Sequence, residues 1–89
     1  AGAYVLARAG HPLLYLERGG KGILRLDSQL DGDSLAAALS FLVGEANAGR
    51  VAQLKIERFD GEPIIGSAFE PLMVAAGFSR QPRRLVVPG

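Results

Sequence analysis

Three glycines surround one lysine in the stretch LERGGKGILRL, at Gly19, Gly20, Lys21 and Gly22. Such a loop can bind phosphate when it has the form G-x-x-x-x-G-K-[ST] and leads from a strand into a helix, because backbone amides and the helix N-terminus together hold the anion. Here a glycine and a strand-like apolar run follow the lysine, so the magnesium-binding hydroxyl and the helix are both missing. We interpret the stretch as a hairpin turn whose glycines accept positive φ, with Arg18 and Lys21 at its solvated tip.

Acid–base or metal chemistry would depend on the single histidine, His11, which stands in a turn between Gly10 and Pro12. No partner for it can be assigned from spacing. The chain has no cysteine, and one histidine cannot complete a zinc site. The serines lack a G-x-S-x-G elbow, and Glu57 and Asp60 flank a turn rather than a recognisable pocket. We therefore predict no catalytic residue, no metal site and no cofactor in this chain.

Basic side chains offer a second kind of chemistry, the binding of phosphate groups. The net charge is only +1, so nucleic-acid binding would depend on local clustering. The last twelve residues, FSRQPRRLVVPG, contain three arginines and no acid; they indicate either a solvated edge strand protected by charge or a phosphate contact. A mixed-charge stripe around Glu57 indicates a hydrated or domain-facing sheet surface, or a docking surface for nucleic acid. The candidate nucleic-acid-binding residues are Lys55, Arg58, Arg80, Arg83 and Arg84.

The elements that must position these residues belong to one small domain. The chain has 89 residues, of which 48% are hydrophobic and 21% charged, as is typical of a globular fold with a single core. Strand-like runs at residues 3–7 and 12–18 flank the turn AGHP, and a third run at 23–26 follows the glycines, which predicts a three-stranded meander. The apolar stretches are too short to span a membrane and the start lacks a signal-peptide layout, so we expect a cytoplasmic protein.

A helix is predicted after the turn DSQLDGDS, with Asp33 or Ser34 as its N-cap. It should end near Asn47 or Ala48, because Gly49 suits the position after a helix. Apolar residues recur at the helical period and form its predicted inner face: Leu35, Leu39, Leu42, Val43 and Ala46.

The stretch VAQLKIERF alternates polar and apolar residues, which predicts a central strand facing this helix. A second helix is predicted at 68–76, with Phe69, Leu72, Met73 and Ala76 inward. Its cap is either Ser67 with Glu70 as a capping box, or Glu70 followed by Pro71 as the first helical residue. The run RRLVVP predicts a last strand, for which an edge position suits Pro82 and Pro88. The order β-β-β-α-β-α-β predicts an α+β fold, an antiparallel or mixed sheet with two helices on one face.

Residues 56–87, IERFDGEPIIGSAFEPLMVAAGFSRQPRRLVV, resemble the C-terminal end of the large helicase-related (Lhr) family of bacterial ATP-dependent helicases. In that family a strand ending in an ER-x-DGEP turn leads through a small-residue cap into a helix ending in AAGF, then PR and a final apolar strand. The upstream YLERGGKGILRL also looks like the family's glycine-turn hairpin. The matching features here are Glu57-Arg58, Asp60-Gly61-Glu62-Pro63, Ser67, Ala75-Ala76-Gly77-Phe78 and Pro82-Arg83.

The resemblance implies that residues 1–89 are a single C-terminal accessory domain excised from a much larger DNA helicase. Such a parent chain would couple ATP hydrolysis to 3′-to-5′ movement on single-stranded DNA and unwind duplexes, including RNA–DNA hybrids, in DNA repair. ATP and Mg would bind its motor domains, and the uracil-DNA glycosylase activity linked to some members would lie upstream. The implied partners are other domains of the same polypeptide, DNA or an RNA–DNA hybrid, and a second copy through the C-terminal region, without a membrane. The alternative is a structural or oligomerisation module with no nucleic-acid contact.

Overall fold

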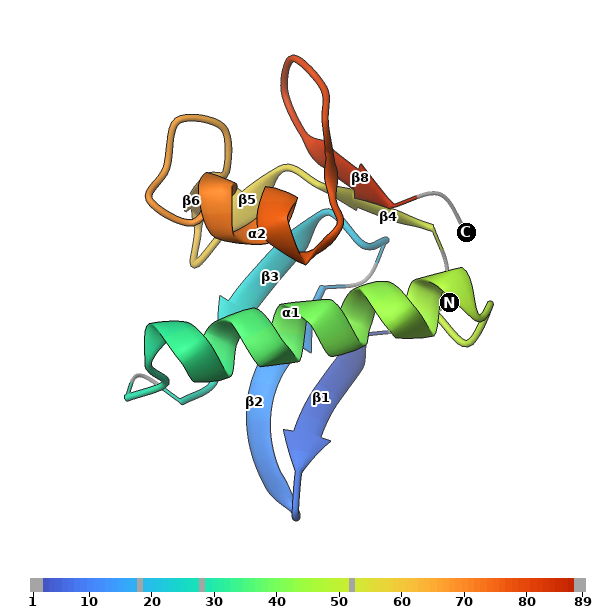
Figure 1. Cartoon of the computed structure of the whole chain (residues 1–89), viewed down its shortest axis with the longest axis vertical. Helices are drawn as coiled ribbons and strands as arrows, with labels where there is room; N and C mark the ends of the chain where they lie inside the picture. The colour runs from blue at the N-terminus through green and yellow to red at the C-terminus, as the bar shows by residue number, and fades with distance from the viewer. Residues whose placement is uncertain (1–2, 18, 28, 52, 88–89) are drawn as a thin grey trace.

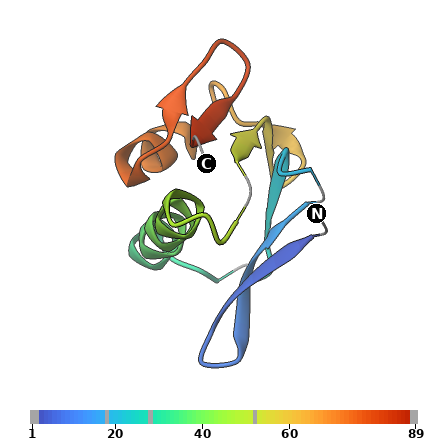
Figure 2. The same ribbon diagram turned by 90° about the vertical axis from the view of Figure 1, so that its right-hand side faces the viewer.

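The computed structural model describes residues 3–17, 19–27, 29–51 and 53–87. These residues form a five-stranded sheet of order β1-β2-β3-β5-β6 and a three-stranded sheet of order β4-β8-β7, with both helices on one side (Figures 1 and 2). The larger sheet is mixed, because β3 and β5 run parallel and its other pairs antiparallel. The predicted α+β class, with two helices on one face of a mixed sheet, is confirmed.

The first three strands form the predicted meander. β1 (Tyr4–Arg8) pairs antiparallel with β2 (His11–Leu16), and β2 pairs antiparallel with β3 (Gly22–Arg25). Between β1 and β2 the chain turns at Ala9 and Gly10, whose φ angles are 51° and 80°. Positive φ at both turn residues matches the twist of the flanking strands, which favours this tight two-residue connection, and Ala9 bears the steric cost of a Cβ in the left-handed region.

The glycine cluster is a hairpin turn, as predicted. The Glu17 N–H donates to the Gly22 carbonyl at 2.8 Å, and the Gly20 N–H donates to the Glu17 carbonyl at 2.9 Å. Gly19 and Gly20 have φ of 89° and 71°, which a residue with a Cβ rarely adopts. Of the two predicted tip residues, Lys21 is exposed and Arg18 lies outside the described residues.

The backbone of this turn also docks against the strand that follows α1 in sequence. The Gly20 carbonyl accepts from the Lys55 N–H at 3.3 Å. The Lys21 carbonyl accepts from the Glu57 N–H at 2.7 Å and from the Arg58 N–H at 3.1 Å. The glycine turn therefore joins the two sheets through main-chain hydrogen bonds.

The first helix, α1, spans Gly32–Asn47 and starts earlier than predicted. Its N-cap is Asp31, whose carboxylate accepts from the Ser34 N–H at 2.7 Å. The prediction of Asp33 or Ser34 as the cap is wrong, because the extended backbone of Asp31 already places its side chain against the third helical amide. The helix ends at Asn47 with Ala48 as its C-cap, in agreement with the predicted end near Asn47 or Ala48. Its predicted inner face is buried in full: Leu35, Leu39, Leu42, Val43 and Ala46.

The single central strand predicted at 51–59 is wrong, because the chain changes sheets at Glu57. β4 (Leu54–Ile56) is an edge of the three-stranded sheet, whereas β5 (Arg58–Phe59) lies between β3 and β6 (Glu62–Pro63) in the larger one. The two adjacent amides that share the Lys21 carbonyl mark this change of direction. It shifts the alternation by one residue, so that Phe59 is buried and Arg58 is exposed.

The second helix, α2 (Glu70–Ala76), begins after Phe69, which is its N-cap without a side-chain hydrogen bond. Both predicted caps are therefore wrong. The Glu70 carboxylate accepts from the Gly66 N–H at 2.7 Å. The Ser67 hydroxyl donates to the Ile64 carbonyl at 2.7 Å and accepts from the Phe69 N–H at 3.2 Å. The helix ends at Ala76, as predicted, and Gly77 is its C-cap at φ 124°. Of the predicted inner face, Met73 is fully buried, and the others pack partly buried against the core: Phe69, Leu72 and Ala76.

Where the sequence predicts one last strand, the structure has two strands, β7 (Ser79–Arg80) and β8 (Leu85–Val87). β8 pairs with both β4 and β7, so the predicted edge position is wrong and β8 is the central strand of its sheet. The Gln81 N–H donates to the Arg84 carbonyl at 2.8 Å and closes this hairpin. Pro82 lies in the hairpin turn, and Pro88 lies outside the described residues.

Candidate functional site

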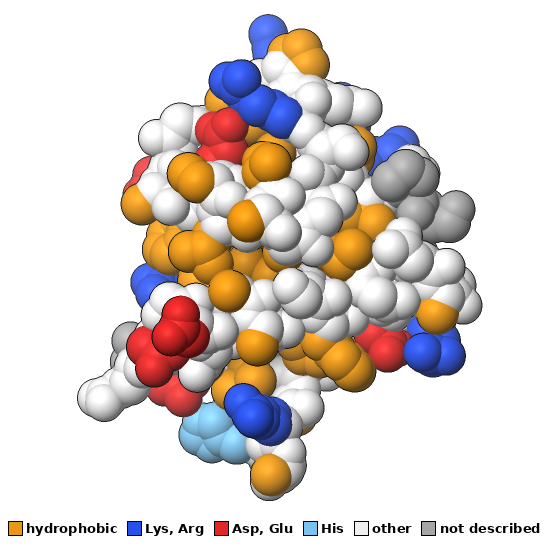
Figure 3. Space-filling view, in the orientation of Figure 1, with side chains coloured by type: hydrophobic (Ala, Val, Ile, Leu, Met, Phe, Trp, Pro, Cys, Tyr) orange, Lys and Arg blue, Asp and Glu red, His pale blue; other side chains and the backbone are white. Residues whose placement is uncertain are grey.

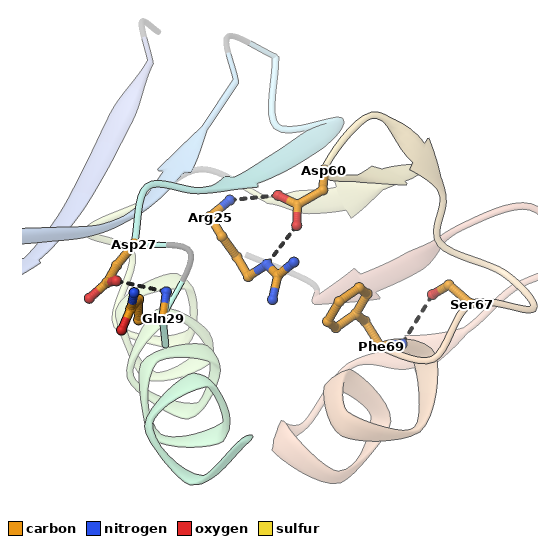
Figure 4. A network of polar contacts seen from close by, with 6 residues as sticks. All are labelled: Arg25, Asp27, Gln29, Asp60, Ser67 and Phe69. Carbon is orange, nitrogen blue, oxygen red and sulfur yellow. Dashed lines mark hydrogen bonds and ion pairs between the residues drawn. The ribbon is translucent and has the colours of Figure 1, made fainter. Parts of the chain in front are cut away.

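A polar and aromatic cluster joins β3 to the β5–β6 turn and the start of α2. Asp60 has a left-handed φ of 54°, and its carboxylate accepts from the Arg25 backbone N–H at 2.7 Å and from Arg25 Nε at 2.6 Å (Figure 4). The Arg25 guanidinium lies 4.9 Å from the centre of the Phe69 ring, which stacks on Phe59 at 4.3 Å. Both charged groups are half-buried. The cluster clamps three elements together, which is a structural role.

No local pattern of the sequence points to this cluster, because Arg25 and Asp60 are 35 positions apart. The Asp-Gly pair at Asp60-Gly61 signals a turn with positive φ, and that much is readable from sequence. The choice of Arg25 as the partner depends on the parallel pairing of β3 with β5.

His11 does have an acidic partner, which spacing alone did not reveal. Its Nε2 lies 3.0 Å from a carboxylate oxygen of Asp27. The pKa of Asp27 is lowered below its ordinary value, mainly because the Gln29 backbone N–H donates to it and also because of His11. The pair is on the surface and lines neither of the two hollows described below, so it supplies no enclosed site for acid–base chemistry.

Four of the five candidate nucleic-acid-binding residues lie on the small sheet. Lys55 is on β4, Arg80 is on β7, and Arg83 and Arg84 are in the β7–β8 turn. Arg58 is on the larger sheet instead. Cross-strand pairing places Lys55 opposite β8, next to the hairpin that carries the three arginines.

Two of these five cations are already paired with acids. Arg58 lies 3.0 Å from Glu17, and Arg80 lies 2.9 Å from Glu70. Among the residues that the structure describes, Lys55, Arg83 and Arg84 take part in no ion pair. Figure 3 shows acidic side chains interspersed with basic ones on the face that it presents, rather than one continuous basic patch.

The fold adds Lys21 to the cations without an ion pair near the small sheet. The sequence placed it at a hairpin tip, and the structure brings its backbone against the strand that carries Lys55. Its side chain is exposed, and it has no ion pair with another described residue. The available cations around the small sheet are therefore Lys21, Lys55, Arg83 and Arg84.

Two hollows mark the surface. One of about 260 Å³ lies between the β1–β2 hairpin and α1. The other, of about 320 Å³, lies between the glycine turn and β4 and is lined by Tyr4, Glu17 and Gln53 among others. None of the five candidate cations lines either hollow.

Within residues 3–17, 19–27, 29–51 and 53–87, no group of three or more His, Cys, Asp or Glu side chains is gathered as a metal site would require. Neither helix in this described part of the chain has the length and apolarity needed to cross a lipid bilayer. What the described residues define is an α+β module with surface cations and a structural clamp.

Comparison with known proteins adds one relative. The chain is 33% identical over 92 aligned residues, which cover 96% of its length, to a protein of Mycolicibacterium smegmatis named "Lhr helicase/ probable uracil glycosylase". The chain spans 6% of the length of that relative. No protein-family model and no solved structure matches the chain. The chain is thus similar to a small region of a helicase-type protein, in agreement with the resemblance drawn from its motifs.

Proposed function

We propose that this chain is a non-motor accessory module of an ATP-dependent 3′-to-5′ DNA helicase of the Lhr type that acts in DNA repair. The observation that carries the proposal is the 33% identity across 96% of the chain to a segment of the Mycolicibacterium smegmatis helicase. ATP and Mg would bind elsewhere in such a polypeptide, because the glycine turn leads into strand β3 and not into a helix whose N-terminus could hold a phosphate. The module's role is to organise its neighbouring domains and to contact nucleic acid.

The nucleic-acid contact is proposed for the unpaired cations of the small sheet. Lys55, Arg83 and Arg84 have no carboxylate partner among the described residues, so binding a phosphate would not require an existing ion pair to break. Arg58 and Arg80 would have to leave Glu17 and Glu70 first. We therefore rank the first three above the other two as phosphate contacts.

The test is fluorescence anisotropy of the chain with labelled single-stranded DNA, duplex DNA and an RNA–DNA hybrid, at several salt concentrations. Each phosphate contact contributes about 0.7 to 0.9 to the slope of log K against log salt. The double variant Arg83→Ala/Arg84→Ala should therefore flatten this slope by about 1.4 to 1.8. The control, Arg8→Ala, removes one positive charge from β1 of the five-stranded sheet and should flatten the slope less than either single variant, Arg83→Ala or Arg84→Ala. An unchanged slope in the first variant would exclude the proposed contact.

A second candidate function is a structural or oligomerisation module without nucleic-acid contact. The net charge of +1 and the pairing of Arg58 and Arg80 with acids favour it. Analytical ultracentrifugation with and without DNA separates the two functions. Self-association without DNA binding supports the structural module, whereas salt-dependent DNA binding supports the first proposal.

A further inference from the structure

The hollow between the β1–β2 hairpin and α1 has apolar walls. β1 contributes Leu6, Ala7 and Arg8 to its lining, and α1 contributes Ala37 and Phe41. Phe41 is 54% exposed, the highest fraction among the exposed large hydrophobic residues. In Figure 3, apolar side chains gather where α1 faces the hairpin. At about 260 Å³ the hollow falls below the roughly 300–1,000 Å³ of small-molecule sites, so it suits one or two apolar side chains better than a separate ligand.

β1 is also the outer strand of the five-stranded sheet. On its open side, its backbone N–H and C=O groups have no strand partner within the described part of the chain. An added strand can use such an edge, because main-chain hydrogen bonds supply affinity and alternate side chains enter neighbouring pockets. A strand laid beside β1 would turn every second side chain toward the helix-covered face of the sheet, where the hollow lies.

The charge at this edge limits what can bind there. Arg8 is exposed, lines the hollow and forms no ion pair with any described residue. Leu6 and Arg8 both line the hollow and are two positions apart in the same strand. An antiparallel segment would therefore place an acidic side chain opposite Arg8 and, two positions later, an apolar side chain opposite Leu6.

We infer that the β1 edge and this hollow dock an extended segment of the same longer polypeptide, with the pattern acidic, any, apolar. The inference rests on the proposed function, in which this chain is one module of a large protein. The matched segment makes up 6% of the helicase relative, so in a polypeptide of that kind most of the available chain lies outside the module. The apolar side chain fills the hollow against Phe41, and the acidic side chain pairs with Arg8.

Site-specific photo-crosslinking in the full polypeptide that contains this chain tests the inference. Phe41 is replaced by benzoyl-phenylalanine, and ¹⁴N- and ¹⁵N-labelled copies are mixed so that links within one copy are distinguished from links between copies. Val74, 44% exposed on α2 and not part of the hollow, carries the same probe as the control. We expect position 41 to link within one copy to a segment with the stated pattern, and position 74 not to reach that segment.

Charge reversal at Arg8 is the second part of this test. Arg8→Glu should lower the yield of the position-41 link about fivefold, and changing the mapped acid to Lys in the same protein should restore it. The inference would be overturned by links to another copy, by the absence of a link at position 41, or by a position-41 crosslink yield that Arg8→Glu does not change. The proposed function is tested separately by DNA anisotropy and by the presence of helicase motor motifs in the polypeptide, so the inference can fail while the proposed function stands, and the two failures are distinguishable.

Discussion

Removing the Asp60 carboxylate should destabilise the protein more than its half-exposed position suggests. In Asp60→Ala the backbone N–H of Arg25 loses its acceptor, which costs about 1–3 kcal/mol in a partly buried site. Loss of the Arg25–Asp60 ion pair adds up to about 1 kcal/mol at this exposure. Alanine also tolerates the left-handed φ of 54° poorly, at a cost of about 1–2 kcal/mol. These contributions sum to about 2–6 kcal/mol, and the expected decrease in the free energy of unfolding lies near the middle of this range, at about 3–4 kcal/mol.

This loss is large for a chain of this size, because 89 residues imply a total of about 4–13 kcal/mol. It corresponds to a decrease in Tm of roughly 12–30 °C. Urea unfolding followed by circular dichroism measures the free energy, and a thermal scan measures Tm. Asp60→Gly separates the backbone cost from the contacts, since glycine accepts positive φ: it should be about 1 kcal/mol more stable than Asp60→Ala. Equal stability of the two variants, or an Asp60→Ala change below about 0.5 kcal/mol, would refute the reasoning.

Three further predictions concern other parts of the fold. Gly77→Ala should lower the unfolding free energy by about 2–3 kcal/mol, because its φ is 124° and a Cβ would lie 3.0 Å from a Val43 methyl. Phe59→Ala should cost about 3–5 kcal/mol, since Phe59 is 1% exposed in the core. Hydrogen bonds hold the pKa of Asp27 and Asp31 below the ordinary value, so their stabilisation is complete above the ordinary pKa and is lost as pH falls through the lowered values. Urea midpoints measured from pH 6 to pH 2 should decline less steeply when both are Asn.

Each of these has a control. Gly49→Ala has φ of 79° in open space and should cost less than Gly77→Ala, and the reverse order would contradict the contact with Val43. Phe41→Ala removes an exposed ring and should change stability far less than Phe59→Ala. If the double Asn variant loses stability in acid as steeply as the original chain, other carboxylates govern the acid transition.

The local patterns of the sequence predicted the local structure well. The inner face of α1 follows from the spacing of leucines, and Gly19 and Gly20 mark a turn because few other residues adopt their φ. The N-cap was harder to place, since several polar residues within a short stretch, Asp31 among them, can cap a helix equally well in isolation. Only the approach of the preceding chain decides between them, and that approach is a tertiary property.

Sheet membership was not readable from alternation. The run from Leu54 to Phe59 alternates almost as one strand does, yet Ile56 and Phe59 are buried in different sheets. The change at Glu57 depends on a carbonyl of Lys21, 36 positions earlier in the chain. The candidate cations were identified by residue type alone. Only the fold shows which of them already form ion pairs with acidic side chains.

The change of sheet at Glu57 has a consequence for how the protein folds. The β3–β5 pair joins Gly22 to Arg58 and the β4–β8 pair joins Leu54 to Val87, so both sheets close long loops and both depend on the same few residues. Such non-local pairing makes folding slower than in helical bundles, in the range between these and all-β folds that is typical of mixed α/β domains. A nascent chain that stops before Leu85 lacks the central strand of the small sheet, which leaves β4 unpaired with β8. During synthesis the module therefore stays incomplete until its last strand has emerged.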